Sequence, residues 1–193
     1  MSNLSTTSEE ILASAQKLIV AGGYNGFSYA DIAAVVGIRK ASIHHHFPSK
    51  ADLVRTLVLR YRENAEAGMA ELERNVPEPF ELIQAYTGHW ARCIEDASLP
   101  FCVCAMLASE LPALPNEVAA EVRAFFRSLS TWLASVMERG QQRGSLTVSG
   151  SARVEAEAFM ATVHGAMLSA RAYGTPAVFA TILGPTLQRL KPQ

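Results

Sequence analysis

Six basic side chains lie within residues 37–62 of this chain, where Asp52 supplies the only carboxylate. They are Arg39, Lys40, Lys50, Arg55, Arg60 and Arg62, so this stretch has a local net charge of +5. Arginine can pair bidentately with guanine, whereas lysine acts on phosphate as a point charge. Residues 63–193 carry ten basic and fourteen acidic side chains, a net charge of −4. A basic region on an otherwise acidic chain predicts a single face that binds nucleic acid. The alternative is the solvated polar face of a small helical bundle.

A short helix expected at Lys40–His46 would carry part of this polar surface. Its apolar positions, Ile43 and Phe47, are expected to point inward. The outward positions are then Arg39, Lys40, Ser42, His44 and His45. Lys50 opens the following helix, where free backbone amides and the helix dipole attract phosphate.

Capping and turn residues predict the elements on either side. Ser28 followed by Asp31 forms a capping box that starts a helix, and Gly37 supplies the backbone freedom for a tight turn. Ser49 with Asp52 caps the helix that comes after Lys40–His46. Two short helices around a tight turn form a helix-turn-helix, whose second helix has the size to enter a DNA major groove.

The register of these residues resembles the N-terminal signature of the TetR family of bacterial transcriptional regulators. The matching residues are Ser28-x-x-Asp31-Ile32-Ala33-x-x-x-Gly37-Ile38-x-Lys40-x-x-Ile43-x-x-His46-Phe47-x-Ser49-Lys50-x-x-Leu53. Two positions depart from the family pattern: His44 stands where tyrosine is usual, and Arg39 where a small N-cap is usual. Both keep a hydrogen-bonding group on the DNA side.

With this resemblance, the residues expected to contact double-stranded operator DNA are Ser28, Arg39, Lys40, Ala41, Ser42, His44, His45 and Lys50. The resemblance also implies a homodimer and a small-molecule effector. No cofactor is expected. The chain is interpreted as a ligand-responsive regulator, a repressor released from its operator by a small apolar or electrophilic molecule.

The remaining sequence shows helical patterns and no convincing strand, which predicts an all-α fold. We expect a three-helix DNA-binding head at residues 1–49 and a larger helical ligand-binding and dimerisation body at residues 50–193. A capping box at Thr7–Glu10 starts the first helix, which runs to Gly22. The other expected helices are Lys50–Asn75, Phe80–Asp96, Leu99–Glu110, Asn116–Gln142, Ala152–Tyr173 and Pro176–Leu190.

Small residues recur on the apolar faces of the last two helices. They are Ala158, Ala161, Gly165, Ala166, Ala170, Ala177, Ala180 and Gly184. They suit a close helix–helix dimer seam and a monomer core equally well, and the resemblance implies a four-helix dimer interface built from these two helices.

Aromatic, sulfur-containing and imidazole side chains at helical spacing could line a cavity in the body. The residues expected to bind the effector are Tyr86, Trp90, Cys93, Cys102, Phe125, Met160, His164 and Met167. An apolar wall with one or two polar anchors is what a small-molecule pocket requires. The alternative is an ordinary core in which Trp90 and His164 are satisfied internally.

The three cysteines, Cys93, Cys102 and Cys104, lack the C-x-x-C spacing of a zinc or redox motif. They read as small buried hydrophobes or as a thiol sensor, because Phe101–Glu110 is similar to the helix of TetR-like regulators that detect electrophiles or oxidants. Consecutive helical residues point about 100° apart, so His44–His46 cannot converge on one metal ion.

No catalytic constellation emerges, although His89 and Cys93 share a helical face. An all-α enzyme acting on a small apolar substrate is the alternative function. The N-terminus has no secretory pattern, and Ala172–Gln188 is interrupted by glycine and proline, so no membrane partner is expected. An odd cysteine count fits a reducing compartment, and we expect a soluble cytoplasmic protein.

Overall fold

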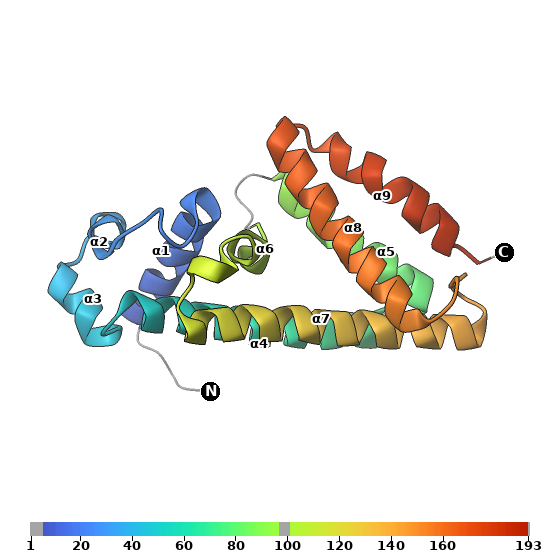
Figure 1. Cartoon of the computed structure of the whole chain (residues 1–193), viewed down its shortest axis with the longest axis horizontal. Helices are drawn as coiled ribbons and strands as arrows, with labels where there is room; N and C mark the ends of the chain where they lie inside the picture. The colour runs from blue at the N-terminus through green and yellow to red at the C-terminus, as the bar shows by residue number, and fades with distance from the viewer. Residues whose placement is uncertain (1–5, 97–100, 193) are drawn as a thin grey trace. The chain divides into compact units, whose positions relative to one another are not determined.

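The computed structural model describes residues 6–96 and 101–192, and every regular element within them is helical (Figure 1). The all-α prediction is therefore confirmed. The elements are α1 (Thr6–Gly22), α2 (Tyr29–Val36), α3 (Lys40–His46), α4 (Lys50–Asn75), α5 (Pro79–Glu95), α6 (Val103–Ala108), the 3₁₀ helix η1 (Leu111–Ala113), α7 (Asn116–Arg143), α8 (Ala152–Tyr173) and α9 (Ala177–Leu190).

The chain divides into two compact units. The first contains Met1–Asn64 and Pro100–Phe126, and the second contains Ala65–Leu99 and Arg127–Gln193. Helices α4 and α7 each contribute residues to both units. The predicted boundary between a DNA-binding head at residues 1–49 and a ligand-binding and dimerisation body at residues 50–193 stays a prediction.

In the first unit, α1 packs against both α2 and α6, and α2 packs against α3. Ile11 and Ile19 of α1, Ile32 of α2, Ile43 of α3 and Leu53 of α4 are fully buried. The inward position predicted for Ile43 is confirmed. These five side chains form the core behind the helix-turn-helix, which needs such support because α2 and α3 have only eight and seven residues.

Two predicted helix starts differ from the structure. Helix α1 begins at Thr6, so Thr7 lies inside the helix and does not cap it. Ser8 is buried instead, with its Oγ 3.0 Å from Nδ1 of His46. The helix expected at Leu99–Glu110 is shorter, since α6 begins after Cys102, whose Sγ accepts a hydrogen bond from the Ala105 amide at 3.4 Å. Leu99 itself lies outside the described residues.

In the second unit, α8 packs along α9, and α5 packs against both (Figure 1). Phe159 and Met167 of α8, Leu82 and Ile83 of α5 and Leu133 of α7 are fully buried there. These side chains form the apolar core of the unit.

A polar clamp fixes the end of α9 to α8 in this unit. Arg189 donates two hydrogen bonds to the Glu155 carboxylate, at 2.9 Å and 2.6 Å, although the Glu155 side chain is only 6% exposed. The Thr147 amide donates to the carbonyl oxygen of Leu190 at 3.0 Å. The last turn of the chain is thus bound at two separate points.

Arg189→Ala should lower the free energy of unfolding by about 1–3 kcal/mol, because it leaves the buried Glu155 carboxylate without its cation. The loss stays below that of a fully buried pair because the Arg189 side chain is 45% exposed. Urea denaturation measures it. The matched control is Arg153→Ala, which removes an exposed ion pair with Glu157 and should change the same free energy by less than about 0.5 kcal/mol. Equal effects of both variants would contradict the clamp.

Candidate functional site

The helix-turn-helix is built as its capping residues indicated. Ser28 accepts a hydrogen bond from the Ala30 amide at 3.2 Å, and Asp31 accepts from the Ser28 amide at 2.7 Å. The Ser28 hydroxyl also donates to Asp31, and these hydrogen bonds lower the pKa of the Asp31 carboxyl. Gly37 ends α2 at φ 75°, in the left-handed region that glycine adopts without strain. At the start of α4, the Ser49 hydroxyl accepts a hydrogen bond from the Asp52 amide at 3.1 Å and donates one to the Asp52 carboxylate at 2.6 Å.

The start of α3 presents two cations to solvent. Arg39 and Lys40 are exposed, and neither side chain has an ion pair or hydrogen bond within the described residues. Ala41 and His45 are exposed as well, and Ser42 is half-buried. A polar surface on a helix of this size, with two free cations at its N-terminal end, has the chemistry to contact phosphates and base edges in a major groove.

His44 and Ser28, by contrast, make contacts within the head. The His44 ring lies edge-on to Tyr29 with the ring centroids 4.7 Å apart, and its Nδ1 is 3.3 Å from the Pro48 carbonyl oxygen. The Ser28 hydroxyl serves the cap of α2. Both residues are exposed and could also reach DNA. Their DNA contacts stay predictions, and each residue has a structural role as well.

Lys50 also has an intramolecular role. Its ammonium donates a hydrogen bond to the Phe27 carbonyl oxygen and lies over the rings of Phe27 and Tyr24, 4.1 Å and 4.8 Å from their centroids. Burial lowers the pKa of Lys50, while nearby Asp31 and Glu110 oppose that shift. The predicted phosphate contact is untested, and the ammonium already holds the α1–α2 turn.

Sequence reasoning missed Tyr29, which supports the turn from inside. Its hydroxyl donates to the Phe47 carbonyl oxygen at 2.9 Å, and burial, with the nearby Asp52 charge, raises its pKa to about 12. The signal was available, because Tyr29 and Ile32 are three residues apart and therefore share the buried face of α2.

The residues expected to bind a ligand are divided between the two compact units. Tyr86, Trp90 and Cys93 of α5 lie in the second unit with Met160, His164 and Met167 of α8, and α5 packs against α8 there. Cys102 and Phe125 lie in the first unit. The set as one pocket is therefore still a prediction, and its best-supported part is the α5–α8 group.

Two indole groups in the second unit lack hydrogen-bond acceptors. The Nε1 atoms of Trp90 and Trp132 are buried and make no hydrogen bond within the described residues. An unsatisfied buried donor costs about 1–3 kcal/mol, so an acceptor that reached either indole would be bound favourably. The Trp132 ring lies 5.5 Å from that of Tyr86, measured between ring centroids.

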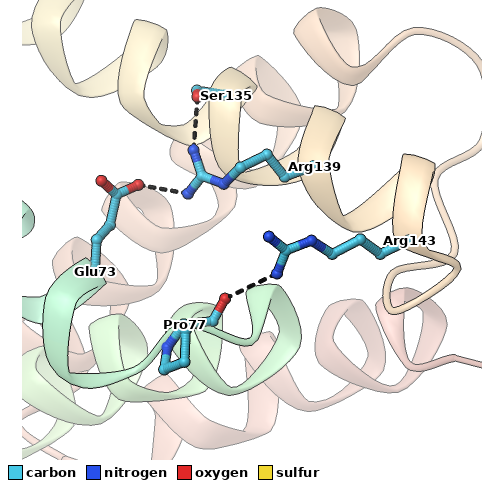
Figure 2. Close-up of polar contacts among 5 residues, drawn as sticks. All are labelled: Glu73, Pro77, Ser135, Arg139 and Arg143. Carbon is cyan, nitrogen blue, oxygen red and sulfur yellow. Dashed lines mark hydrogen bonds and ion pairs between the residues drawn. The ribbon is translucent and has the colours of Figure 1, made fainter.

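Trp132 also lines an open groove in the second unit, with a volume of about 490 Å³. Met69 and charged and hydroxyl side chains of α4 and α7 form the rest of its wall. Figure 2 shows Arg139 between Glu73 and Ser135, to which it donates at 2.5 Å and 2.8 Å. Arg143 donates to the Pro77 carbonyl oxygen nearby. The cation of Arg139 is thus neutralised within the groove.

The three thiols are buried, and burial raises the pKa of each, most strongly that of Cys104. The thiolate is the reactive form, so this environment favours the small-hydrophobe interpretation over a thiol sensor. Cys93 lies 3.7 Å from Nε2 of His89, but its raised pKa is the opposite of what an activated nucleophile needs.

Within the described residues, no three His, Cys, Asp or Glu side chains form a group that could hold a metal ion. None of the helices in the described ranges is both long enough and apolar enough to cross a bilayer.

The outer faces of α8 and α9 combine small residues with large apolar ones. Ala166 and Ala170 are buried within the chain, whereas the other small residues of the predicted seam are exposed. Within the described residues, four large apolar side chains on these two helices are exposed, namely Val154, Leu168, Tyr173 and Ile182. A contiguous apolar surface on these helices would suit a protein contact, as the predicted dimer seam requires.

Two family descriptions match the chain. Residues 11–57 match bacterial regulatory proteins of the tetR family, and residues 79–183 match the tetracyclin repressor-like C-terminal domain. The chain is 61% identical to a TetR-family transcriptional regulator from Agrobacterium tumefaciens, whose crystal structure superimposes with a TM-score of 0.94 over 96% of this chain and 98% of that one.

Two more distant proteins are similar as well. The HTH-type transcriptional regulator CymR of Pseudomonas putida is 28% identical over 140 residues, covering 71% of this chain and 68% of that protein. The reduced form of Escherichia coli NemR shares the fold, with a TM-score of 0.88 and 20% identity over 98% of this chain and 99% of that one.

The pH dependence of unfolding should report the burial of His164. Burial lowers its native pKa to about 4, and a hydrogen bond with the Met160 backbone opposes this shift. As pH falls from about 6.5 to 4, the His164 imidazole is protonated in the unfolded chain but stays neutral in the native protein. The free energy of unfolding should therefore fall by up to about 3 kcal/mol over this range. Urea denaturation should show a shallower decline for His164→Gln, with pH 8 as the reference. Parallel profiles would contradict the assignment.

Native thiols should react slowly with an aromatic disulfide reagent, because each is buried with a raised pKa. The reference is Ser109→Cys, which places an exposed thiol at the end of α6. In the native protein, Cys102 and Cys104 should be labelled at least about tenfold more slowly than the reference thiol of Ser109→Cys. In denaturant, they should be labelled at the same rate as that reference. Native labelling at the reference rate would restore the thiol-sensor interpretation.

Proposed function

The chain belongs to the TetR family of bacterial regulatory proteins, and from this premise we propose that it is a repressor released from operator DNA by a small-molecule effector. The observation that carries the proposal is the pair of exposed cations at the start of α3, Arg39 and Lys40, which have no ion pair within the described residues and follow the capped helix α2. The repressor role is further supported by the name of the Escherichia coli relative, HTH-type transcriptional repressor NemR.

The proposed regulator acts as a homodimer in the cytoplasm. One recognition helix reads too few base pairs for useful specificity, whereas two helices in successive major grooves double the contact set on a near-palindromic site. The exposed apolar and small residues on α8 and α9 support these helices as the dimer seam.

The proposed effector is a small apolar molecule that carries a hydrogen-bond acceptor. The unpartnered indoles of Trp90 and Trp132 support the acceptor, and the buried, weakly acidic thiols favour reversible binding over covalent capture. To release DNA, the effector must bind more tightly to a state whose heads do not fit the operator. A typical coupling of ~1–3 kcal/mol would lower operator affinity about 5–150-fold.

A gel-shift assay on the DNA upstream of the gene, with random DNA as competitor, tests the proposal directly. We expect a specific complex, and sedimentation of that complex should show an even number of chains. A protein that binds specific and random DNA equally, or that sediments as a monomer both free and on DNA, would overturn it.

Substitutions at Arg39 and Lys50 should differ in kind. Arg39→Ala should relax sequence preference, reducing specific binding by roughly 1–3 kcal/mol per half-site if the guanidinium contacts a base. If its ammonium contacts phosphate in addition to holding the Phe27 carbonyl oxygen, Lys50→Ala should weaken specific and random binding alike and lower the salt slope by about one per subunit. Fluorescence anisotropy at several salt concentrations separates the two patterns.

The matched control for both variants is Arg60→Ala, which removes the same charge from an arginine already paired with Glu9 at 2.5 Å. It should change neither specificity nor salt slope appreciably. Equal losses for Arg39→Ala on specific and random DNA would make Arg39 a phosphate contact instead of a base contact.

A further inference from the structure

Glu110, immediately after α6, contacts the turn between α1 and α2. Both carboxylate oxygens lie 3.1 Å from the Tyr24 amide nitrogen, and that amide donates to them. The two residues are 86 positions apart in the sequence, and both belong to the first compact unit. Glu110 therefore lies outside the helix-turn-helix and yet bonds directly to the backbone that leads into it.

The turn has no spare room beside this carboxylate. Gly23 adopts φ +76°, and a Cβ at that position would lie 2.1 Å from Oε1 of Glu110. The Gly23 amide donates to the Ile19 carbonyl oxygen at 2.8 Å and so completes the end of α1. The left-handed backbone favours a glycine at this position, and a side chain there would displace the Glu110 carboxylate.

Lys50 holds the same turn through a different atom. Its ammonium bonds the Phe27 carbonyl oxygen, and the Glu110 charge favours the protonated form of Lys50 against the effect of burial. Phe27 directly precedes Ser28, the N-cap of α2. An anion after α6 and a cation at the start of α4 thus fix the segment that sets where α2 begins.

We propose that Glu110 is a positioning residue for operator binding, which holds the turn at residues 23–28, and with it α2 and α3, by accepting the Tyr24 amide hydrogen. The inference rests on the proposed function, since it concerns affinity for operator DNA. Any displacement of α6 would reach the recognition helix through this contact.

The sign of the effect separates positioning from simple electrostatics. Removing a carboxylate makes the protein less negative, so long-range electrostatics alone would strengthen binding to a polyanion. Loss of the turn anchor would weaken the same binding, because α3 would have to be ordered when DNA binds.

Hydrogen exchange in the free, full-length protein tests the contact itself. The Tyr24 amide should exchange about tenfold or more faster in Glu110→Ala than in wild type, and less so in Glu110→Gln, which keeps a neutral acceptor. The exchange rates of amides in α8 should be the same in both variants as in wild type. Unaltered Tyr24 exchange in Glu110→Ala, or equal acceleration in α8, would overturn the anchor.

Operator affinity tests the consequence. Glu110→Ala should bind operator roughly tenfold more weakly, with Glu110→Gln between it and wild type. The matched control is Glu10→Gln, which removes one negative charge from an exposed position of α1 and should bind no more weakly than wild type. If wild type binds no operator, the proposed function fails. If wild type binds and Glu110→Ala binds as tightly or more tightly, only the positioning role fails.

Discussion

Helices of eight and seven residues do not persist alone in water, and α2 and α3 are that short. Their geometry therefore depends on what lies around them. Ile32 and Ile43 anchor them in the core of the first unit, and the capping box of Ser28 fixes where α2 starts. The buried Tyr29 hydroxyl joins α2 to the residue that ends α3. The surface of α3 therefore depends on this core, on the cap of α2 and on the hydrogen bond at the end of α3.

The distribution of ion pairs follows a related logic. Several cations away from α3 pair with carboxylates of the same chain: Arg60 pairs with Glu9, Arg139 with Glu73 and Arg189 with Glu155. At the start of α3 the described residues provide no such partner for Arg39 or Lys40. A phosphate or a base edge would compensate the desolvation of such a cation, which supports the DNA contacts predicted for these two side chains.

The sequence predicted what local chemistry decides. The bounds of α3 and α8 follow from caps and breakers beside them, so Lys40–His46 and Ala152–Tyr173 were predicted correctly. Contacts between distant segments were missed, because nothing near Tyr24 indicates that its amide bonds Glu110, and Lys50 gave no sign of bonding Phe27. Helical spacing likewise identified apolar stripes on α5 and α8 without showing that Cys102 and Phe125 belong to the other unit.

Both tryptophans of the chain, Trp90 and Trp132, lie in the second unit, and neither indole has a hydrogen-bond acceptor in the described structure. Light at the long-wavelength edge of the protein's absorption band excites tryptophan and not tyrosine. Fluorescence excited there therefore originates in the second unit alone, because the first unit contains tyrosine but no tryptophan. An indole that gains an acceptor shifts its emission to longer wavelength. The unmodified protein is thus its own optical probe for events in the second unit, with no dye or tag on the surface that reads DNA.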